Sequence, residues 1–273
     1  MKQSLLALFT FIICIAFEME VSANPAIFVR EKPVPSATQG FVESIDDEQY
    51  FYLYNVDAQA VAVDLGLPSG TKWANMNVGA TSPQESGLYF AWGETTGYTD
   101  KTTDGRQFDW ANYKWMAEGQ SSWKYINKYQ NDDGQTEASW YENDGYKFVG
   151  DGLTVLEVTD DAAAANWGGD WRMPTIEEYQ ELLDNCTRKW VTIGKVRGRM
   201  FTSKNNGNAI FFPAAGCRYG DSLYGVGLGG YYWSASLSTG YTYDGCDLYF
   251  NSDDVGTDYG VRYDGLPVRA VLR

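Results

Sequence analysis

Histidine is missing from this chain, because none of its 273 residues is a histidine. The absence excludes Ser-His-Asp and Cys-His nucleophile pairs, histidine general bases, and every zinc or non-haem iron site that needs an imidazole ligand. The chemistries that remain are catalysis by carboxylates, calcium binding through oxygen ligands, and binding without catalysis.

Basic side chains are also scarce, since 21 Lys and Arg stand against 36 Asp and Glu and give a formal charge of −15. Phosphate backbones are bound mainly through Lys and Arg, so nucleic acid is excluded as a partner. Anionic lipid surfaces are repelled for the same reason. With 44% apolar residues, the chain still has enough hydrophobic material for a globular core.

Long apolar runs are limited to residues 5–17, which follow Lys2. This run is short for a membrane span but typical of the core of a signal peptide, and small residues precede a predicted cleavage before Asn24. We therefore predict a signal peptide at residues 1–23, with a membrane anchor as the alternative. The rest of the chain would be exported to the cell surface, the periplasm or the extracellular space, without direct membrane insertion after cleavage.

Cysteine is rare after this segment, where Cys186, Cys217 and Cys246 are the three present. None belongs to a C-x-x-C pair, so their spacing indicates no metal site. In an exported protein, one disulfide bond and one buried thiol form the simplest arrangement, and the sequence leaves the pairing open.

Short apolar segments separated by turn residues fill the first part of the chain. Residues 24–60 form a polar leader that ends in an aromatic strand, and later strands are predicted at residues 61–67, 72–78 and 87–92. The long loop at residues 97–152 is rich in Gly, Asn and Asp and carries four tryptophans, Trp110, Trp115, Trp123 and Trp140. We expect these to pack inward, with a sugar-stacking surface as the alternative.

Two helices are predicted in the middle of the chain. Thr175 with Glu178 three residues later forms a capping box, and the apolar residues that follow share one helical face, so a helix should run to Asp184 or Asn185. A weaker alanine-rich helix is predicted at residues 159–165.

After the helices, the pattern is that of β-strands. Residues 190–193 and 196–202 flank a Gly-Lys turn, and Asn206-Gly207 precedes an apolar run at 209–213. Apolar alternation at residues 266–272 predicts a half-buried strand with Arg269 on its outer face. Together these elements predict an α+β domain with mostly antiparallel strands, long loops and two short helices.

Seven motifs in order resemble a known family. They are Asp64-Leu-Gly-Leu-Pro-Ser-Gly-Thr-Lys-Trp73, Asn77-Val-Gly-Ala80, Tyr89-Phe-Ala-Trp-Gly-Glu94, Asn166-Trp-Gly-Gly-Asp-Trp-Arg-Met-Pro-Thr175, Phe212-Pro-Ala-Ala-Gly216, Tyr231-Tyr-Trp-Ser-Ala-Ser236 and Pro267-Val-Arg-Ala-Val271. This set resembles exported Bacteroidetes proteins with the Fibrobacter-type major paralogous domain. The resemblance implies a C-type-lectin-like fold, similar to formylglycine-generating enzymes, over residues 61–273.

Enzymatic and calcium-dependent members of this fold have signatures that are weak here. Formylglycine-generating enzymes bind copper through a cysteine pair, and Cys217 and Cys246 lack the matching context. The Glu-Pro-Asn and Gln-Pro-Asp tripeptides of sugar-binding lectins are absent. Calcium binding through the carboxylate oxygens of Asp253 and Asp254 stays an alternative. We therefore expect no enzyme and no cofactor. A carboxylate enzyme using Asp170 or Glu177 is the minor alternative, but Glu177 is explained by the helix dipole.

The composition changes sharply at residue 216. Residues 216–273 contain no Lys, Glu, Gln or Met, although the preceding 215 residues contain 41 of them. Uniform usage would place about 11 there. A preference of exposed strands and turns for Gly, Asp, Ser and Tyr explains part of this change.

A second resemblance explains more of it. C-type-lectin-like proteins of gut bacteria and their phages include targets of diversity-generating retroelements, which substitute adenines, typically in asparagine codons. Such codons yield Tyr, Asp, Ser or Gly, but not Lys, Glu, Gln, Met or Trp. The resemblance implies a variable ligand-binding region at residues 216–273, with the motif around Trp233 as fixed scaffold. Histidine is also reachable from an asparagine codon, so its absence counts mildly against extensive diversification.

Tyrosine, serine, glycine and aspartate are also the residues of antibody-type binding surfaces, because tyrosine gives a large amphipathic contact at low rotamer entropy. Alternation along residues 247–251 places Asp247, Tyr249 and Asn251 on one face, which we expect to point outward. The candidate ligand-binding residues are Tyr219, Asp221, Tyr224, Leu228, Tyr241, Tyr243, Asp247, Tyr249, Asn251, Asp258, Tyr259, Tyr263 and Asp264.

The sequence thus predicts an exported, non-enzymatic recognition or adhesion protein. Its expected partner is a protein or glycan at a cell or phage surface. The alternative is a carbohydrate-binding lectin that depends on calcium or on tryptophans.

Overall fold

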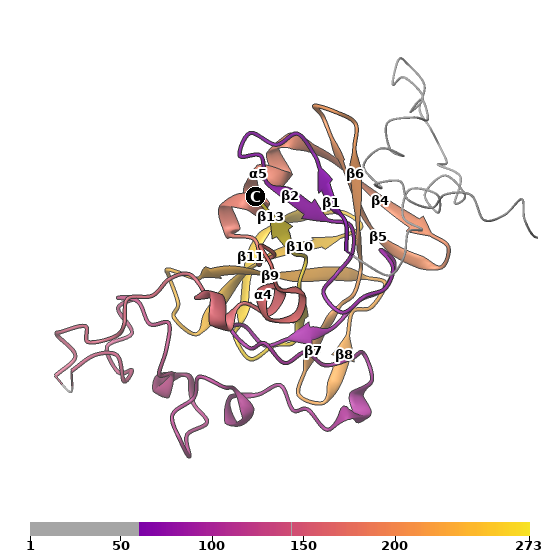
Figure 1. Ribbon diagram of the computed structural model, residues 1–273. Helices are drawn as coiled ribbons and strands as arrows, with labels where there is room; N and C mark the ends of the chain where they lie inside the picture. Colours follow the sequence, from indigo (N-terminus) through magenta and orange to yellow (C-terminus); the bar gives the residue numbers. More distant parts are fainter. Residues whose placement is uncertain (1–59, 143) are drawn as a thin grey trace, which may run out of the picture. The chain divides into compact units, whose positions relative to one another are not determined.

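The central element of the fold is an antiparallel sheet of three strands, β9 (Gly229–Leu237), β10 (Asp244–Asn251) and β11 (Val255–Val261). The structure is a computed structural model that describes residues 60–142 and 144–273 (Figure 1). β10 is the middle strand and β11 lies at one edge. The register pairs Asp247 of β10 with Trp233 on one side and with Asp258 on the other.

Four smaller antiparallel sheets accompany it within the described ranges. One contains β4 (Cys186–Ile193), β5 (Val196–Ser203) and β6 (Ala209–Pro213), and another contains β1 (Ala62–Asp64), β2 (Lys72–Ala74) and β13 (Val271–Leu272). The two-stranded sheets pair β3 (Tyr89–Phe90) with β12 (Leu266–Pro267), and β7 (Cys217–Tyr219) with β8 (Ser222–Tyr224).

Helices are few and short in the part of the chain that the structure describes. The α-helices there are α4 (Ala162–Trp167) and α5 (Ile176–Asn185), and single 3₁₀ turns occur at η2 (Thr102–Asp104), η3 (Trp110–Asn112), η4 (Trp123–Tyr125) and η5 (Val158–Asp160). The α+β class with mostly antiparallel strands and few helices is therefore confirmed.

The capping box that defines α5 is present. Glu178 N–H donates to the Thr175 hydroxyl, and the Glu178 carboxylate accepts from Thr175 N–H at 2.9 Å. α4 begins later than predicted, because the Asp161 carboxylate accepts from the N–H groups of Ala163 and Ala164 and so caps the helix at residue 161. The residues before this cap form the 3₁₀ turn η5 instead.

The predicted hairpins are confirmed as well. β4 and β5 pair along their whole length around the turn at Gly194, and β6 pairs with β5 after the turn at Asn206-Gly207. The strands predicted at residues 61–67, 72–78 and 87–92 are present but shorter, as β1, β2 and β3.

Two separate cores lie against the two faces of the central sheet. Tyr232, Leu248 and Phe250 belong to a core that also holds residues of α5, β5 and β6. Trp233, next to Tyr232 in β9, points to the opposite face and joins a core formed with Trp92 and the segment around β12. Asp247 pairs with Trp233 and lies on the same face of the sheet, so this face is covered by the second core where the two residues meet.

The prediction of one half-buried strand at residues 266–272, with Arg269 on its outer face, was wrong. Residues 266–267 and 271–272 pair with different strands, and Arg269 between them is fully buried rather than exposed. Its guanidinium group donates to Asn77 Oδ1 at 2.9 Å and to the carbonyls of Ala74 and Phe211 at 3.2 and 2.9 Å. Alternation alone could not reveal these partners, because they come from distant segments.

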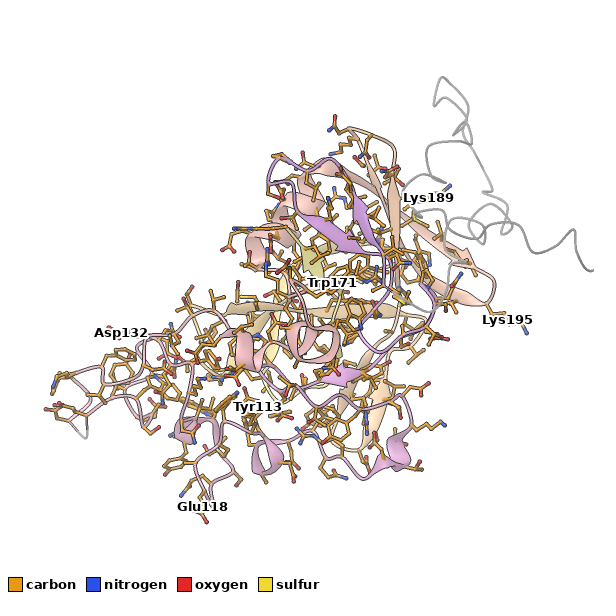
Figure 2. The ribbon with its side chains drawn as sticks, viewed as in Figure 1. Tyr113, Glu118, Asp132, Trp171, Lys189 and Lys195 are labelled. Carbon is orange, nitrogen blue, oxygen red and sulfur yellow. The ribbon has the colours of Figure 1, made fainter. Side chains whose placement is uncertain are left out.

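The tryptophans of residues 97–152 pack inward, as expected. Trp140 is fully buried, and Trp110, Trp115 and Trp123 are half-buried against other aromatic rings. Figure 2 shows Tyr113 directed into the packed interior, whereas Glu118 lies at the outer tip of a loop. Aromatic packing thus replaces regular secondary structure in this region.

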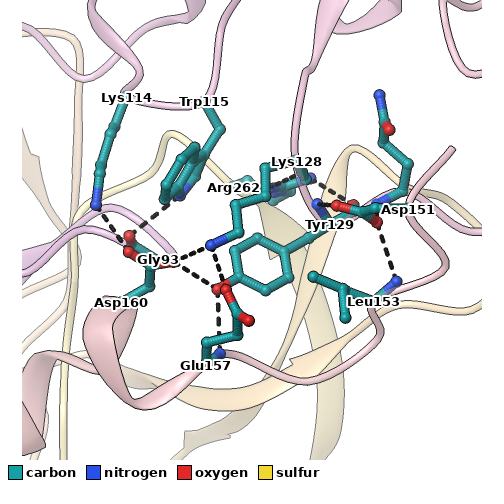
Figure 3. Close-up of polar contacts among 11 residues, drawn as sticks. Gly93, Lys114, Trp115, Lys128, Tyr129, Asp151, Leu153, Glu157, Asp160 and Arg262 are labelled. Atoms are coloured by element: carbon teal, nitrogen blue, oxygen red, sulfur yellow. Dashed lines mark hydrogen bonds and ion pairs between the residues drawn. The ribbon is translucent and has the colours of Figure 1, made fainter.

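A polar network around Tyr129 fixes the same loop (Figure 3). The Tyr129 hydroxyl donates to the Asp160 carboxylate at 2.6 Å, and Lys128 and Lys114 pair with that carboxylate at 2.7 and 2.9 Å. Burial alone would raise the pKa of Asp160, but these bonds outweigh it and hold the pKa below its usual value.

Arg262, which follows β11, joins this loop to the central sheet. It is fully buried, and its guanidinium group donates to the Tyr113 hydroxyl at 2.9 Å. It also donates at 3.0–3.1 Å to three backbone carbonyls, those of Lys128, Tyr129 and Thr242.

Cys186, Cys217 and Cys246 are all free thiols, so the disulfide expected from the sequence is not formed among them. The predicted signal peptide, leader and strand before residue 60 lie outside the described residues. Among the helices that the structure describes, none combines the length and the apolar character needed to cross a bilayer.

We predict that Arg262→Met lowers the free energy of unfolding by about 3 kcal/mol or more, because it leaves several buried acceptors without a donor. Urea unfolding followed by tryptophan fluorescence measures this change. Arg188→Met is the matched control, since Arg188 is exposed on β4 and its replacement should cost less than about 0.5 kcal/mol. Equal effects of the two substitutions would contradict the role given to Arg262.

Candidate functional site

The candidate residues lie on β7, β8, the central sheet and the turns that join them. Seven of the 13 are exposed: Tyr219, Asp221, Tyr224, Leu228, Tyr241, Asp258 and Tyr259. Five are half-buried: Tyr243, Tyr249, Asn251, Tyr263 and Asp264. The remaining one, Asp247, is only 3% exposed.

One group of tyrosines gathers beside the edge strand β11. The Tyr241 ring stacks on Tyr243 at 5.4 Å between centroids and lies 6.3 Å from Tyr259. Tyr243 also contacts Trp123 at 5.1 Å, so its ring is part of the packing of the long loop. Tyr241 and Tyr259 are therefore the members of this group that are free to meet a ligand.

A second group lies at the β7–β8 hairpin. The Tyr219 ring is 5.8 Å from Tyr263, which in turn packs edge-on against Trp110 at 4.7 Å. Tyr219 and Tyr224 are each about half exposed, and Leu228 is more exposed still. The hairpin thus presents aromatic and apolar surface above a packed base.

A third group lies on the central sheet itself. Tyr249 pairs with Tyr231 across β9 and β10, and their rings are 5.3 Å apart. The Asn251 side-chain amide donates to the Tyr249 hydroxyl. The side-chain oxygen Oδ1 of Asn251 accepts from the N–H groups of Asp253 and Asp254 at 2.7 and 2.8 Å, so Asn251 shapes the turn before β11 rather than serving only as a contact residue.

The expectation that Asp247 points outward was wrong. Leu248 and Phe250 point into a core as predicted, but the opposite face is itself covered where Asp247 lies beside Trp233. Burial raises the pKa of Asp247 well above its usual range, and the nearby carboxylates of Asp258, Asp264 and Asp244 raise it further.

Asp264 and Asp244 share this environment. Burial raises the pKa of Asp264 to about 7, with a further contribution from Asp244. Burial also raises the pKa of Asp244 to about 6, although Arg262 opposes the change. One carboxylate oxygen of Asp247 and one of Asp264 are buried without any hydrogen-bond partner.

Two residues near the acidic group formed by Asp244, Asp247, Asp258 and Asp264 were not among the candidates. Tyr231 was placed in the fixed scaffold motif, yet it is only half-buried, whereas its neighbour Tyr232 is fully buried. This alternation along the strand is the signal that could have identified it. Cys217 lies close to Asp247 and Asp264, and burial raises the pKa of its thiol to about 11. The thiol therefore stays protonated and is a poor nucleophile.

The residues considered for metal binding or catalysis are not brought together. Asp253, Asp254, Asp170 and Glu177 are all exposed. In the part of the chain that the structure describes, no group of three or more Cys, Asp or Glu side chains is arranged to hold a metal ion. The hollow lined by Gly66, Pro68, Asn185, Lys204 and Asn205 contains none of the 13 candidate residues.

Comparison of the chain with protein-family models, with curated proteins and with solved structures found no match.

We predict that the protein is more stable at pH 5 than at pH 8. A carboxyl whose pKa is raised by folding contributes stability at low pH that is lost as pH rises through the folded value, here about 6 to 7 for Asp244 and Asp264. The carboxylates with lowered pKa values, such as Asp160 and Glu178, titrate below this window.

Thermal unfolding of the double variant Asp244→Asn with Asp264→Asn tests this assignment. The difference in Tm between pH 5 and pH 8 should shrink, mainly through a higher Tm at pH 8. Asp170→Asn removes the same kind of charge from an exposed site and should leave the difference unchanged. An unaltered pH dependence in the double variant would show that these carboxyls are not the cause.

Proposed function

We propose that the protein is an exported, non-enzymatic recognition protein of C-type-lectin-like fold, which binds a protein or glycan through the surface formed by residues 219–264. One observation carries the proposal. Six of the 11 large exposed aromatic or apolar side chains in the described ranges fall within residues 219–259. They are Tyr219, Tyr224, Val226, Leu228, Tyr241 and Tyr259.

The placement of these side chains supports a binding role. They lie on the β7–β8 hairpin and the turn after it, in the turn before β10, and on the edge strand β11. The strands β9 and β10 of the same sheet contribute residues to two cores. Large exposed rings on a rigid base lose little conformational entropy when a partner covers them. Neighbouring glycines and serines leave room for a partner to approach the rings.

A lectin that depends on calcium or tryptophans is the alternative, and it receives less support. The four tryptophans of residues 97–152 are buried or packed against other rings. The acidic residues considered for calcium, Asp253 and Asp254, are exposed and form part of a turn closed by Asn251.

We predict that the triple variant Tyr224→Ala, Tyr241→Ala, Tyr259→Ala loses partner binding by about tenfold or more, because exposed tyrosines are typical hot spots. The labelled protein is first tested on intact bacterial cells, phage particles and a glycan array, and the strongest target is used for the variants. The Tm should hardly change, because all three side chains are exposed.

Tyr146→Ala is the matched control, since Tyr146 is 92% exposed in the long loop, outside this surface. Unchanged binding of the triple variant would overturn the proposed surface. Loss of the glycan-array signal on addition of EDTA would favour the calcium-dependent lectin instead.

The proposal that a retroelement diversifies residues 216–273 makes a separate prediction about the neighbouring DNA. A near-copy of these codons should carry asparagine codons at exposed sites such as Tyr219, Tyr224, Tyr241 and Tyr259, next to a reverse transcriptase gene. The buried residues Arg218, Tyr232 and Arg262 should be identical in the two copies, because the fold depends on them. Sequencing of the locus tests this, and the absence of such a copy would refute diversification without affecting the binding proposal.

A further inference from the structure

The acidic group beside Trp233 is the strongest unexplained feature of the described residues. Oδ1 of Asp247 and Oδ1 of Asp264 are buried without a hydrogen-bond partner. Asp247 is 3% exposed, and Asp264 is half-buried. Buried carboxyl oxygens are normally satisfied, because an unpaired one destabilises the folded state. Such an arrangement suggests that these oxygens are reserved for a ligand.

The charges around this pair are of one sign. The groups that act most strongly on Asp247 are the carboxylates Asp258, Asp264 and Asp244. Asp258 stands directly opposite Asp247 in the sheet, where two like charges are unfavourable. A cation between them would relieve this repulsion.

The protein's own buried arginines are bound elsewhere. The Arg262 guanidinium donates to Tyr113 and to three backbone carbonyls. Two nitrogens of the Arg218 guanidinium lie 2.6 and 3.2 Å from the Asp104 carboxylate. Neither group forms a hydrogen bond with Asp247 or Asp264. Burial raises the pKa of both carboxyls, so a cation supplied by another molecule competes with a proton for these oxygens.

The geometry around Asp247 suits a flat, hydrogen-bonding cation. Tyr231 and Tyr249 lie on the same sheet face, with their ring centroids 5.3 Å apart. A Cβ atom on Gly260 would lie 3.3 Å from Asp247 Oδ2 and 3.2 Å from Trp233 Cη2, so glycine at this position keeps the carboxylate clear on the β11 side. Rings beside a carboxylate favour guanidinium, which stacks on aromatic faces while its N–H groups donate to oxygen.

We propose that Asp247 and Asp264 form a subsite for the guanidinium group of an arginine on a protein partner, flanked by Tyr231 and Tyr249 and entered past Asp258. The proposal rests on the recognition function proposed above. Because Asp247 is only 3% exposed, the half-buried ring of Tyr231 has to move aside before it can flank a bound guanidinium. A metal ion fits less well, because no three carboxyl or thiol side chains of the described residues, these aspartates included, are arranged to hold one.

The test uses the full protein with ¹³C-labelled tyrosine, followed by NMR at physiological salt. The probe is the tripeptide acetyl-Gly-Arg-Gly-amide, and its matched control carries citrulline, which has the shape of arginine without the charge. The arginine peptide should shift the ring signals of Tyr231 and Tyr249 in a saturable way, and the citrulline peptide should not. Asp247→Asn and Asp264→Asn should each weaken binding by about tenfold or more.

Asp170→Asn controls for the general attraction of a cation to an acidic protein, and it should change the affinity by less than about twofold, because long-range charge effects are screened. Urea unfolding at pH 8 checks that both site variants are folded, and their stability should equal or exceed that of the parent. The proposal is overturned if citrulline binds as well as arginine or if both site variants keep full affinity. It is likewise overturned if a lysine peptide binds more tightly, or if CaCl₂ alone produces the same Asp247-dependent shifts.

The outcome separates the subsite from the proposed function. If the tyrosine variants lose the partner while Asp247→Asn retains both the partner and the peptide, the subsite is refuted and the recognition function stands. If the arginine peptide binds through Asp247 but no cell, phage or glycan target is found, the subsite stands and the recognition function is refuted.

Discussion

Buried guanidinium groups hold this structure together. Arg218, Arg262 and Arg269 are each fully buried, and their donors reach backbone carbonyls on segments far away in the sequence. Long loops such as residues 97–152 have few of the backbone hydrogen bonds that join paired strands. An arginine that donates to several of their carbonyls therefore fixes the loop as a paired strand would. Removing one would leave several acceptors buried without donors. The exposed tyrosines are therefore presented on loops and strands held in defined positions.

The same long-range contacts explain how far the fold could be predicted. α5 and the β4–β5–β6 meander follow from signals within a few residues, namely the capping box at Thr175 and two-residue turns between apolar runs. Arg269 was misplaced because its acceptors lie on residues 74, 77 and 211, and alternation carries no information about them. Local patterns report which side of a strand is apolar, but not whether the other side is covered.

Asp247 shows the same limit within the candidate site. Exposure was predicted well for residues in turns and hairpins, such as Tyr219, Tyr241 and Tyr259, because glycine-rich turns lie at the surface. It failed in the middle strand, where both faces of the sheet meet a core. Tyr231 was missed because the sequence motif that contains it was assigned to the fixed scaffold. The alternation of burial between Tyr231 and Tyr232 was given less weight than this resemblance.

The pairing of β13 with β2 has a consequence for how the chain folds. Val271 lies opposite Trp73, so a sheet near the start of the described region is completed by residues that emerge from the ribosome much later. Trp73 belongs to a main core, which cannot close before that strand arrives. Topologies dominated by such non-local pairs fold slowly. The core that contains Trp73 is therefore completed only after the last strand of the chain has been synthesised.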